Sequence, residues 1–267
     1  MQSDKAIPPA NAVLFVPGAG HGAWCFEKIR PWLEASAIKV LTTDLPGCSD
    51  DPAQIQHITM EDEVHRVMEM ARAIAEPLTL VGHSSGGAII SQAAEKLGRN
   101  KIEKLIYLDA FMPRTGESVI SLAEKADQYN RSKGPVNYIS LQAERFLFHD
   151  GRQIFRWNPA LVEQLFYHDC TTEDLELAKK SLKWNHISSI STPVNLTEEN
   201  FGAIPKYYIL CTQARDLDKS SIANNLPAEN IHRIASSHSP FLSMPEELGK
   251  ILVEIVQVKP ARTMMST

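Results

Sequence analysis

Gly82-His83-Ser84-Ser85-Gly86 directly follows the apolar run 77–81 and precedes a helix-like stretch at 87–97. A serine on a sharp turn between a strand and a helix stands clear of the backbone as a nucleophile. Glycines on both sides suit such a turn, because side chains at Gly82 and Gly86 would collide where the strand and the helix pass closely. We therefore take Ser84 as the first candidate for a reactive atom.

Short apolar runs alternate with amphipathic helical stretches through the first half of the chain, and the pattern resumes near its end. Such alternation predicts an α/β fold with a mostly parallel sheet flanked by helices on both faces. Thr59 and Asp62 have capping-box spacing at the start of one helix, and Ser243 and Glu246 have it at the start of the last one. The predicted strands are 12–16, 39–43, 77–81, 104–108, 207–212 and 231–235.

The alternation stops between about 111 and 204, where helical patches rich in aromatic residues take over. We interpret 111–204 as a helical lid inserted into a core made of 1–110 and 205–267, with a frayed tail at 259–267. A lid over a pocket mouth contributes part of the substrate wall, so we expect an apolar acyl or alcohol pocket. The lid aromatics are Phe146, Phe148, Phe155, Trp157, Phe166, Tyr167 and Trp184.

The composition is that of a soluble globular protein. Of the 267 residues 43% are hydrophobic and the net charge is −5, which gives no basic face for nucleic acid. Without a secretory signal or a membrane span in the sequence, we expect a cytoplasmic monomer or homodimer. No histidine and carboxylate cluster has metal-ligand spacing, and no cofactor is expected. The cysteines Cys25, Cys48, Cys170 and Cys211 lack paired spacing and are predicted to be buried free thiols.

A serine nucleophile needs a base and a carboxylate that orients the base. His238 lies in Ser236-Ser237-His238-Ser239-Pro240, after the last predicted strand and before the C-terminal helix, where a loop can bend over the sheet edge. The acid is open, because Asp216 and Asp218 follow one predicted strand and Asp109 ends another. Either loop could reach His238.

The loop Pro17-Gly18-Ala19-Gly20-His21-Gly22 follows the first strand, where a second oxyanion donor is expected. The helix after the elbow, predicted to begin at Ser84, places its unpaired N–H groups near the same point. The main-chain N–H groups of Ala19 and Ser85 are therefore the candidate oxyanion hole.

A dinucleotide site is the competing interpretation of the same loop. Gly18, Gly20 and Ala23 match G-x-G-x-x-A, Asp44 ends the next strand, and a Tyr129-x-x-x-Lys133 pair is present. We reject it because it leaves Ser84 and His238 unexplained. It also needs Tyr129 on a helix, and we place Tyr129 in an irregular region.

Together these residues resemble the α/β-hydrolase fold, specifically the group of plant methylesterases, hydroxynitrile lyases and small bacterial esterases. The resemblance runs nearly end to end. It is carried by Pro17-Gly18-Ala19-Gly20-His21-Gly22-Ala23-Trp24, Gly82-His83-Ser84-Ser85-Gly86-Gly87, Tyr107-Leu108-Asp109-Ala110-Phe111-Met112-Pro113, Phe166-Tyr167-His168-Asp169-Cys170 and His238-Ser239-Pro240-Phe241.

The chain departs from this family pattern at two places. Pro17 replaces the histidine that usually opens the oxyanion loop, and Ala214 stands where relatives tend to carry the catalytic aspartate. Three explanations account for the missing aspartate at 214. The acid is Asp216 after a loop shift, or it is Asp109 from the end of the preceding strand, or the triad is incomplete. We favour Asp109 slightly, because it needs no rearranged loop.

The resemblance implies a cofactor-independent serine esterase in which Ser84 attacks a small, largely apolar carboxylic ester. A degenerate hydrolase that only binds a ligand is the alternative suggested by Ala214. A hydroxynitrile lyase is disfavoured, because the family's lyases carry a threonine at the position of Ala19 and a lysine at the position of Ser239. His168-Asp169-Cys170 has no assigned role and is expected to be lid structure.

Overall fold

The computed structural model describes residues 12–136, 143–149 and 151–258, so the predicted tail at 259–267 lies outside the described residues. Its centre is a six-stranded sheet in the order β10-β9-β5-β4-β1-β2, and each neighbouring pair is parallel. The strands are β1 (Ala12–Val16), β2 (Lys39–Thr42), β4 (Leu78–His83), β5 (Ile102–Leu108), β9 (Lys206–Cys211) and β10 (Ile231–Ile234). All six predicted strands are confirmed, with ends displaced by at most two residues.

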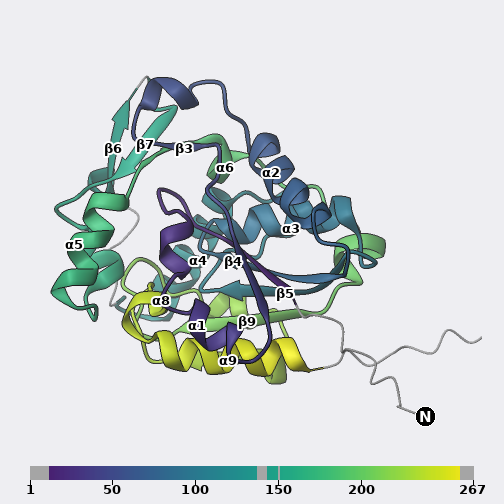
Figure 1. Cartoon of the computed structure of the whole chain (residues 1–267). Helices are drawn as coiled ribbons and strands as arrows, with labels where there is room; N and C mark the ends of the chain where they lie inside the picture. The colour runs from purple at the N-terminus through teal and green to yellow at the C-terminus, as the bar shows by residue number, and fades with distance from the viewer. Residues whose placement is uncertain (1–11, 137–142, 150, 259–267) are drawn as a thin grey trace, which may run out of the picture.

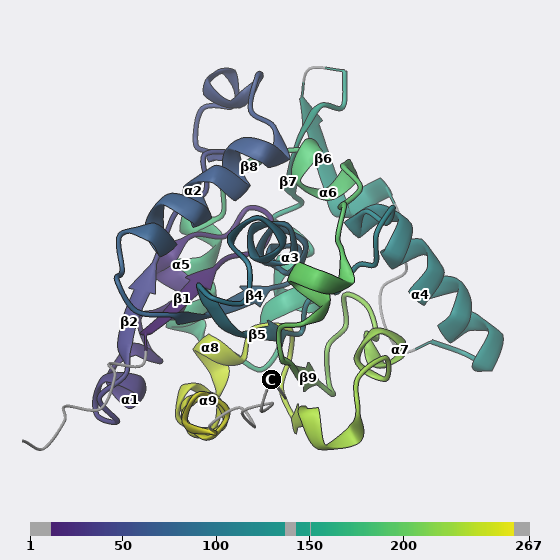
Figure 2. The same ribbon diagram turned by 90° about the vertical axis from the view of Figure 1, so that its right-hand side faces the viewer.

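Helices cover both faces of this sheet, as the alternation predicts (Figures 1 and 2). In β1, Leu14 and Val16 pack into one core cluster, and Val13 and Phe15 into another on the opposite face. The first cluster includes α2 (Met60–Arg72) and α3 (Gly86–Leu97); the second includes α1 (Arg30–Glu34) and α9 (Pro245–Gln257). A strand buried on both faces reads as a continuous apolar run, which is the pattern seen in the sequence.

A second, four-stranded sheet lies in the order β3-β8-β7-β6, with antiparallel pairs. It consists of β3 (Cys48–Ser49), β6 (Phe146–His149), β7 (Ile154–Trp157) and β8 (Trp184–His186). The expectation of purely helical patches was wrong here, because the aromatics of β6 and β7 recur every second residue, the period of a strand. The division into a core and an inserted lid stays a prediction.

Helices fill the rest of 111–204 and the loops beyond it. The α-helices are α4 (Val119–Lys133), α5 (Thr172–Ser181), α6 (Ser188–Ser191), α7 (Ser220–Ala223) and α8 (Pro240–Ser243). Single turns of 3₁₀-helix occur at Ala23–Phe26, Pro52–Ile55, Ala143–Arg145 and Ala228–Asn230, and π-helical turns at Glu163–Tyr167 and Glu198–Gly202.

Two helices begin at other residues than predicted. The capping box of Thr59 and Asp62 is confirmed, but Ser243 belongs to α8, and α9 begins at Pro245 with no side-chain cap. The proline supplies a helical φ at the first position, which replaces the expected cap. The helix after the elbow begins at Gly86 and not at Ser84.

Tyr129 was also misplaced, because it and Lys133 lie on α4 and not in an irregular region. The Lys133 ammonium lies 5.1 Å from the centre of the Tyr129 ring, which is half exposed. This pair lines no part of the cavity at Ser84. It therefore brings no support to the dinucleotide interpretation.

Parallel pairing brings the carboxyl ends of β1, β4, β5, β9 and β10 to one edge of the sheet. Ligand sites of open α/β sheets lie at this edge. The four cysteines are free thiols; Cys25 and Cys211 are buried, whereas Cys48 and Cys170 are partly exposed. Within the described chain, no helix has the length and apolarity needed to span a bilayer, and the cytoplasmic location stays a prediction.

Candidate active site

Ser84 occupies the sharp turn between β4 and α3, with φ at +53°. A Cβ at Gly82 would lie 2.7 Å from the Gly86 carbonyl oxygen, and one at Gly86 would lie 2.6 Å from that of Val16. These close backbone approaches are the physical reason for the glycines. The turn leaves Ser84 partly exposed between buried neighbours, as a nucleophile requires.

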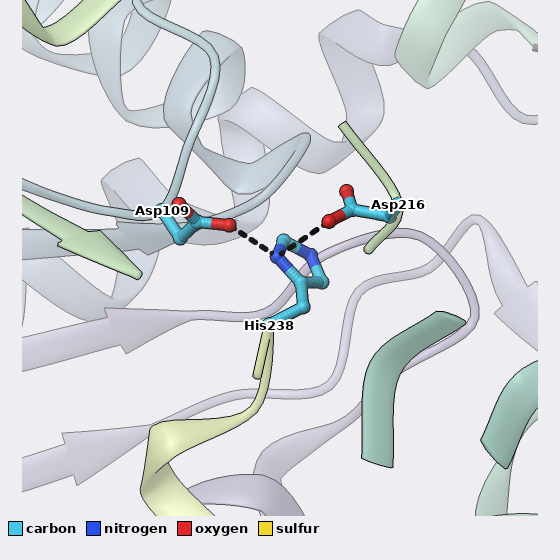
Figure 3. A group of neighbouring side chains, drawn as sticks. All are labelled: Asp109, Asp216 and His238. Carbon is cyan, nitrogen blue, oxygen red and sulfur yellow. Dashed lines mark hydrogen bonds and ion pairs between the residues drawn. The ribbon is translucent and has the colours of Figure 1, made fainter. Parts of the chain in front are cut away.

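Asp109 and His238 make a direct side-chain contact (Figure 3). His238 Nδ1 lies 2.6 Å from Asp109 Oδ2, and both side chains are buried. Asp109 has a φ of +41° at the end of β5, and its other carboxylate oxygen accepts the Cys211 N–H at 3.2 Å. Positive φ at non-glycine residues is a strained geometry that concentrates at functional sites, and Ser84 shares it.

Asp216 approaches the same imidazole nitrogen from the loop after β9 (Figure 3). Its Oδ1 lies 3.6 Å from His238 Nδ1, which is beyond hydrogen-bond distance. The structure thus brings both candidate acids to His238, with Asp109 in the bonding position. Asp218 is exposed and accepts the Ser220 N–H at 2.8 Å, as a turn residue.

Lys219 is a site residue that the sequence analysis missed. Its fully buried ammonium lies 2.9 Å from Asp109 Oδ2 and 2.7 Å from Asp216 Oδ2. Burial alone would lower the pKa of Lys219, but the two carboxylates raise it above its usual value. The sequence did contain one signal for this ion pair, the three-residue spacing of Asp216 and Lys219. It contained no signal that the pair would be buried.

Burial and neighbouring charges also act in opposite directions on the pKa of Asp216. Burial alone would raise its pKa, yet His238 and Lys219 lower it below the usual value. The ligand atoms of Asp109, Asp216 and His238 all lie within 4.8 Å of one another, a spacing that could hold a metal ion. In this structure both carboxylates bind the Lys219 ammonium instead.

The Ala19 N–H, the expected oxyanion donor, donates to the Ser85 hydroxyl at 2.8 Å. The loop around it is held from the second sheet: the Trp157 indole N–H donates to the Ala19 carbonyl at 2.8 Å, and the Gly20 N–H to Asn185 Oδ1 at 3.0 Å. An incoming carbonyl oxygen must therefore compete with the Ser85 hydroxyl for the Ala19 N–H.

His83 lies beside His238, and His21 lies beside His83, with ring centres 5.5 Å apart. The His83 and His238 rings are 4.5 Å apart between centres, and His83 Nε2 lies 3.0 Å from the His238 carbonyl oxygen. Burial lowers the pKa of His21 to about 4 and that of His83 well below its usual value. Both rings are neutral at neutral pH and add no positive charge near the base.

The segment His168-Asp169-Cys170 supports the loop that carries His238. Asp169 accepts the Ser237 N–H at 2.7 Å, and His168 Nε2 lies 3.0 Å from the Gln213 carbonyl oxygen. These contacts give the segment the physical role that sequence alone did not supply. It anchors the loops after β9 and β10.

A cavity of about 580 Å³ opens at Ser84. Most of its wall is apolar and comes from 111–204, including Phe146, Phe148, Phe155, Trp157 and Phe166. Ala19, Ser84 and Ser85 also line it, so the elbow and the oxyanion loop face the same space. In the described part of the chain, no hydrogen bond joins the Ser84 hydroxyl to His238. Such catalytic bonds often tighten only when substrate is bound.

A family model described as "Alpha/beta hydrolase family" matches residues 13–250. The chain belongs to this family. The predicted fold class and the family resemblance are thereby confirmed.

Several curated and solved relatives cover most of the chain. "Putative methylesterase 11, chloroplastic" of Arabidopsis thaliana is 29% identical over 94% of this chain, which spans only 65% of that relative's length. "Salicylic acid-binding protein 2" of Nicotiana tabacum is 30% identical over 91% of this chain and 95% of its own. The crystal structure of polyneuridine aldehyde esterase superposes with a TM-score of 0.78 at 25% identity, covering 92% of this chain and 98% of that one.

Asp109, Asp216 and Lys219 are the charged side chains that lie within 3.6 Å of His238 Nδ1 in the described residues. Ala214 packs partly buried against the core, and the carboxylates near His238 are Asp109 and Asp216. The substitution at 214 therefore does not leave the imidazole without a carboxylate.

Proposed function

We propose that the protein is a serine carboxylic-ester hydrolase that acts on small, largely apolar esters through an acyl-enzyme. The observation that carries the proposal is the common edge of the sheet, where Ser84 faces the cavity and the buried Asp109–His238 pair is made by residues that follow β5 and β10. Relatives named methylesterase and aldehyde esterase support the same reaction class.

In this mechanism Ser84 Oγ attacks the ester carbonyl while His238 takes its proton and then gives it to the departing alcohol. Asp109 fixes the imidazole orientation through Nδ1 and stabilises the imidazolium that forms. The Ser85 and Ala19 N–H groups bind the oxyanion. For this the Ala19 N–H must release the Ser85 hydroxyl and donate to the oxyanion instead. Water then attacks the acyl-enzyme while His238 takes its proton, and His238 returns that proton to Ser84 Oγ as the carboxylic acid leaves.

The pocket wall supports apolar acyl or alcohol groups. A volume of about 580 Å³ fits a substrate of drug-like size, and the aromatic side chains of the wall offer no strong hydrogen-bond partners beyond the Trp157 indole. The Trp157 N–H is already donated to Ala19. The wall also contains Glu124, Asp127, Gln128, Arg131 and Arg145, so selection among esters depends on shape, on apolar area and on contacts with these polar side chains.

Burst kinetics on p-nitrophenyl esters, from acetate to longer chains, test the proposal with the unmodified protein and Ser84→Ala. We expect a burst that equals the enzyme concentration, and a loss of roughly 10³-fold or more in kcat for Ser84→Ala. Ser132→Ala, at the exposed end of α4, is the matched control and should keep full activity.

Absence of Ser84-dependent turnover with every ester would overturn the esterase proposal. A thermal shift by salicylate-like or ester ligands without turnover would instead identify a ligand-binding protein. A cyanohydrin lyase is not favoured: Ser239 follows His238, and Lys219 bonds to carboxylates and lines no part of the cavity.

A further inference from the structure

Two carboxylates and one ammonium are packed against the Nδ1 side of a single imidazole. Asp109 Oδ2 lies 2.6 Å and Asp216 Oδ1 3.6 Å from His238 Nδ1, and Lys219 Nζ lies 3.5 Å from the same atom. Lys219 and Asp109 are fully buried, and Asp216 nearly so. At these distances in a dry interior each unit of charge strongly biases the protonation of the imidazole.

Asp109, Asp216 and Lys219 together carry the same net charge as a single aspartate would. Asp109 and Asp216 contribute two negative charges and Lys219 one positive charge, which leaves one net negative charge among the three groups at His238 Nδ1. An uncompensated second carboxylate would favour the imidazolium, and a protonated imidazole cannot accept the proton of Ser84.

We propose, building on the esterase function above, that Lys219 is a positioning residue for the base. Its ammonium cross-links Asp109 and Asp216 and cancels one of their charges, so that His238 faces a single net negative charge. Lys219 binds each carboxylate at its Oδ2, which holds Asp109 against His238 Nδ1 and keeps Asp216 close to the same nitrogen.

Other charged and titratable groups surround this cluster. His83 and His21 are kept neutral by burial, so they leave the sum unchanged. Asp169 binds the main-chain N–H of Ser237, and Arg145 binds the main-chain carbonyl of Asp216. The buried Arg145 guanidinium is a second positive charge that acts on Asp216 and lowers its pKa, and it is present in every variant compared below. Lys219 is the cation that contacts both carboxylates directly.

The test uses Lys219→Met, Asp216→Asn and the double variant, which differ in the charge they leave beside His238. We expect the midpoint of the His238 imidazole titration, followed by NMR of histidine-labelled protein, to rise by at least about 1 pH unit in Lys219→Met, because two carboxylates remain. In Asp216→Asn it should fall, because one negative charge near the imidazole is removed. The double variant should return to within about half a unit of the unmodified protein.

The kcat/KM profile on an ester should follow these shifts, with the acid limb at higher pH in Lys219→Met and lower pH in Asp216→Asn. Lys104→Met is the matched control: Lys104 is a second fully buried lysine, bound to the Val256 carbonyl, and its loss should leave the His238 midpoint unchanged. Unchanged midpoints in Lys219→Met, or a double variant that fails to return, would overturn the proposal.

Should Lys219→Met fail to fold, Asp216→Asn and the double variant still decide the question, because they differ only by the ammonium charge. The double variant must then have the higher midpoint. The NMR titration needs no turnover, so shifts of the expected sign in a protein that hydrolyses no ester would refute the esterase function while keeping Lys219 as the charge partner. Ester turnover with midpoints that do not move would refute the role of Lys219 alone.

Discussion

Asp109 and Asp216 both approach the His238 imidazole, but at different distances from Nδ1. Asp109 makes the 2.6 Å contact, so Asp109→Asn should lower kcat by roughly 10³–10⁴-fold, because an amide stabilises the wrong imidazole tautomer. Asp216→Asn should cost about 10-fold or less at the pH optimum. Steady-state kinetics of both variants on one ester measure the difference, and a larger loss in Asp216→Asn would reassign the acid.

Glu63 on α2 is a buried carboxylate for which the described residues offer no hydrogen-bond partner. Burial raises its pKa to about 8, with a smaller contribution from Asp62. The folded state therefore binds the carboxyl proton of Glu63 more tightly than the unfolded state does. The stability that this protonation gives the fold is fully present below about pH 4.5 and is lost as the pH rises to about 8. The residue contributes a pH-dependent loss of stability that a neutral side chain would not have.

Glu63→Gln should therefore gain stability over the unmodified protein as pH rises, by on the order of 3 kcal/mol between pH 5 and 8. Urea unfolding at a series of pH values measures this gain. Glu69→Gln, on the exposed face of the same helix, is the control and should show no such trend. A constant difference between Glu63→Gln and the unmodified protein across this range would contradict the assignment.

At the scale of elements, the strand, turn and helix around Ser84 depend on glycine for steric reasons. A Cβ at Gly82 would meet the Gly86 carbonyl oxygen at 2.7 Å and Gly87 Cα at 2.9 Å, all of it backbone that cannot move aside. Gly82→Ala should lower the free energy of unfolding by roughly 3 kcal/mol or more and disturb the Ser84 turn.

Gly98 is the comparison for Gly82, because a side chain there would meet backbone strain but no steric collision. It has φ at +72°, and the nearest atom to an added Cβ is 3.9 Å away. Gly98→Ala should therefore cost only about 1–2 kcal/mol. Denaturant unfolding of both variants makes the comparison, and equal losses would show that collision at Gly82 is not what the turn avoids.

Across the whole molecule, the second sheet holds the oxyanion loop. Trp157 donates its indole N–H to the Ala19 carbonyl, and the Lys183 N–H donates to the Gly20 carbonyl at 2.9 Å. Trp157→Phe keeps an aromatic wall but removes the first bond, so kcat should fall about 10-fold with a small change in Tm. Trp184→Phe, also on the second sheet, should leave kcat within about twofold. Equal effects of the two changes on kcat would argue against this coupling.

The sequence by itself determined the alternating strands, the elbow at Ser84 and the placement of His238 after the last strand. Each is written in short-range patterns: apolar period, glycine spacing and a loop between two predicted elements. The helical interpretation of 111–204 failed at β6 and β7, where short strands had to be recognised from period-two aromatics.

Only the tertiary structure decided which groups meet behind His238. Asp109 and His238 are 129 residues apart in sequence, and Asp109 and Lys219 are 110 apart, so no local pattern encodes their contact. The parallel sheet brings these strand ends to one edge, and burial there makes the charge of Lys219 count. Long-range pairing and desolvation are properties of the folded chain, which is why the acid stayed open and Lys219 unseen until the fold was known.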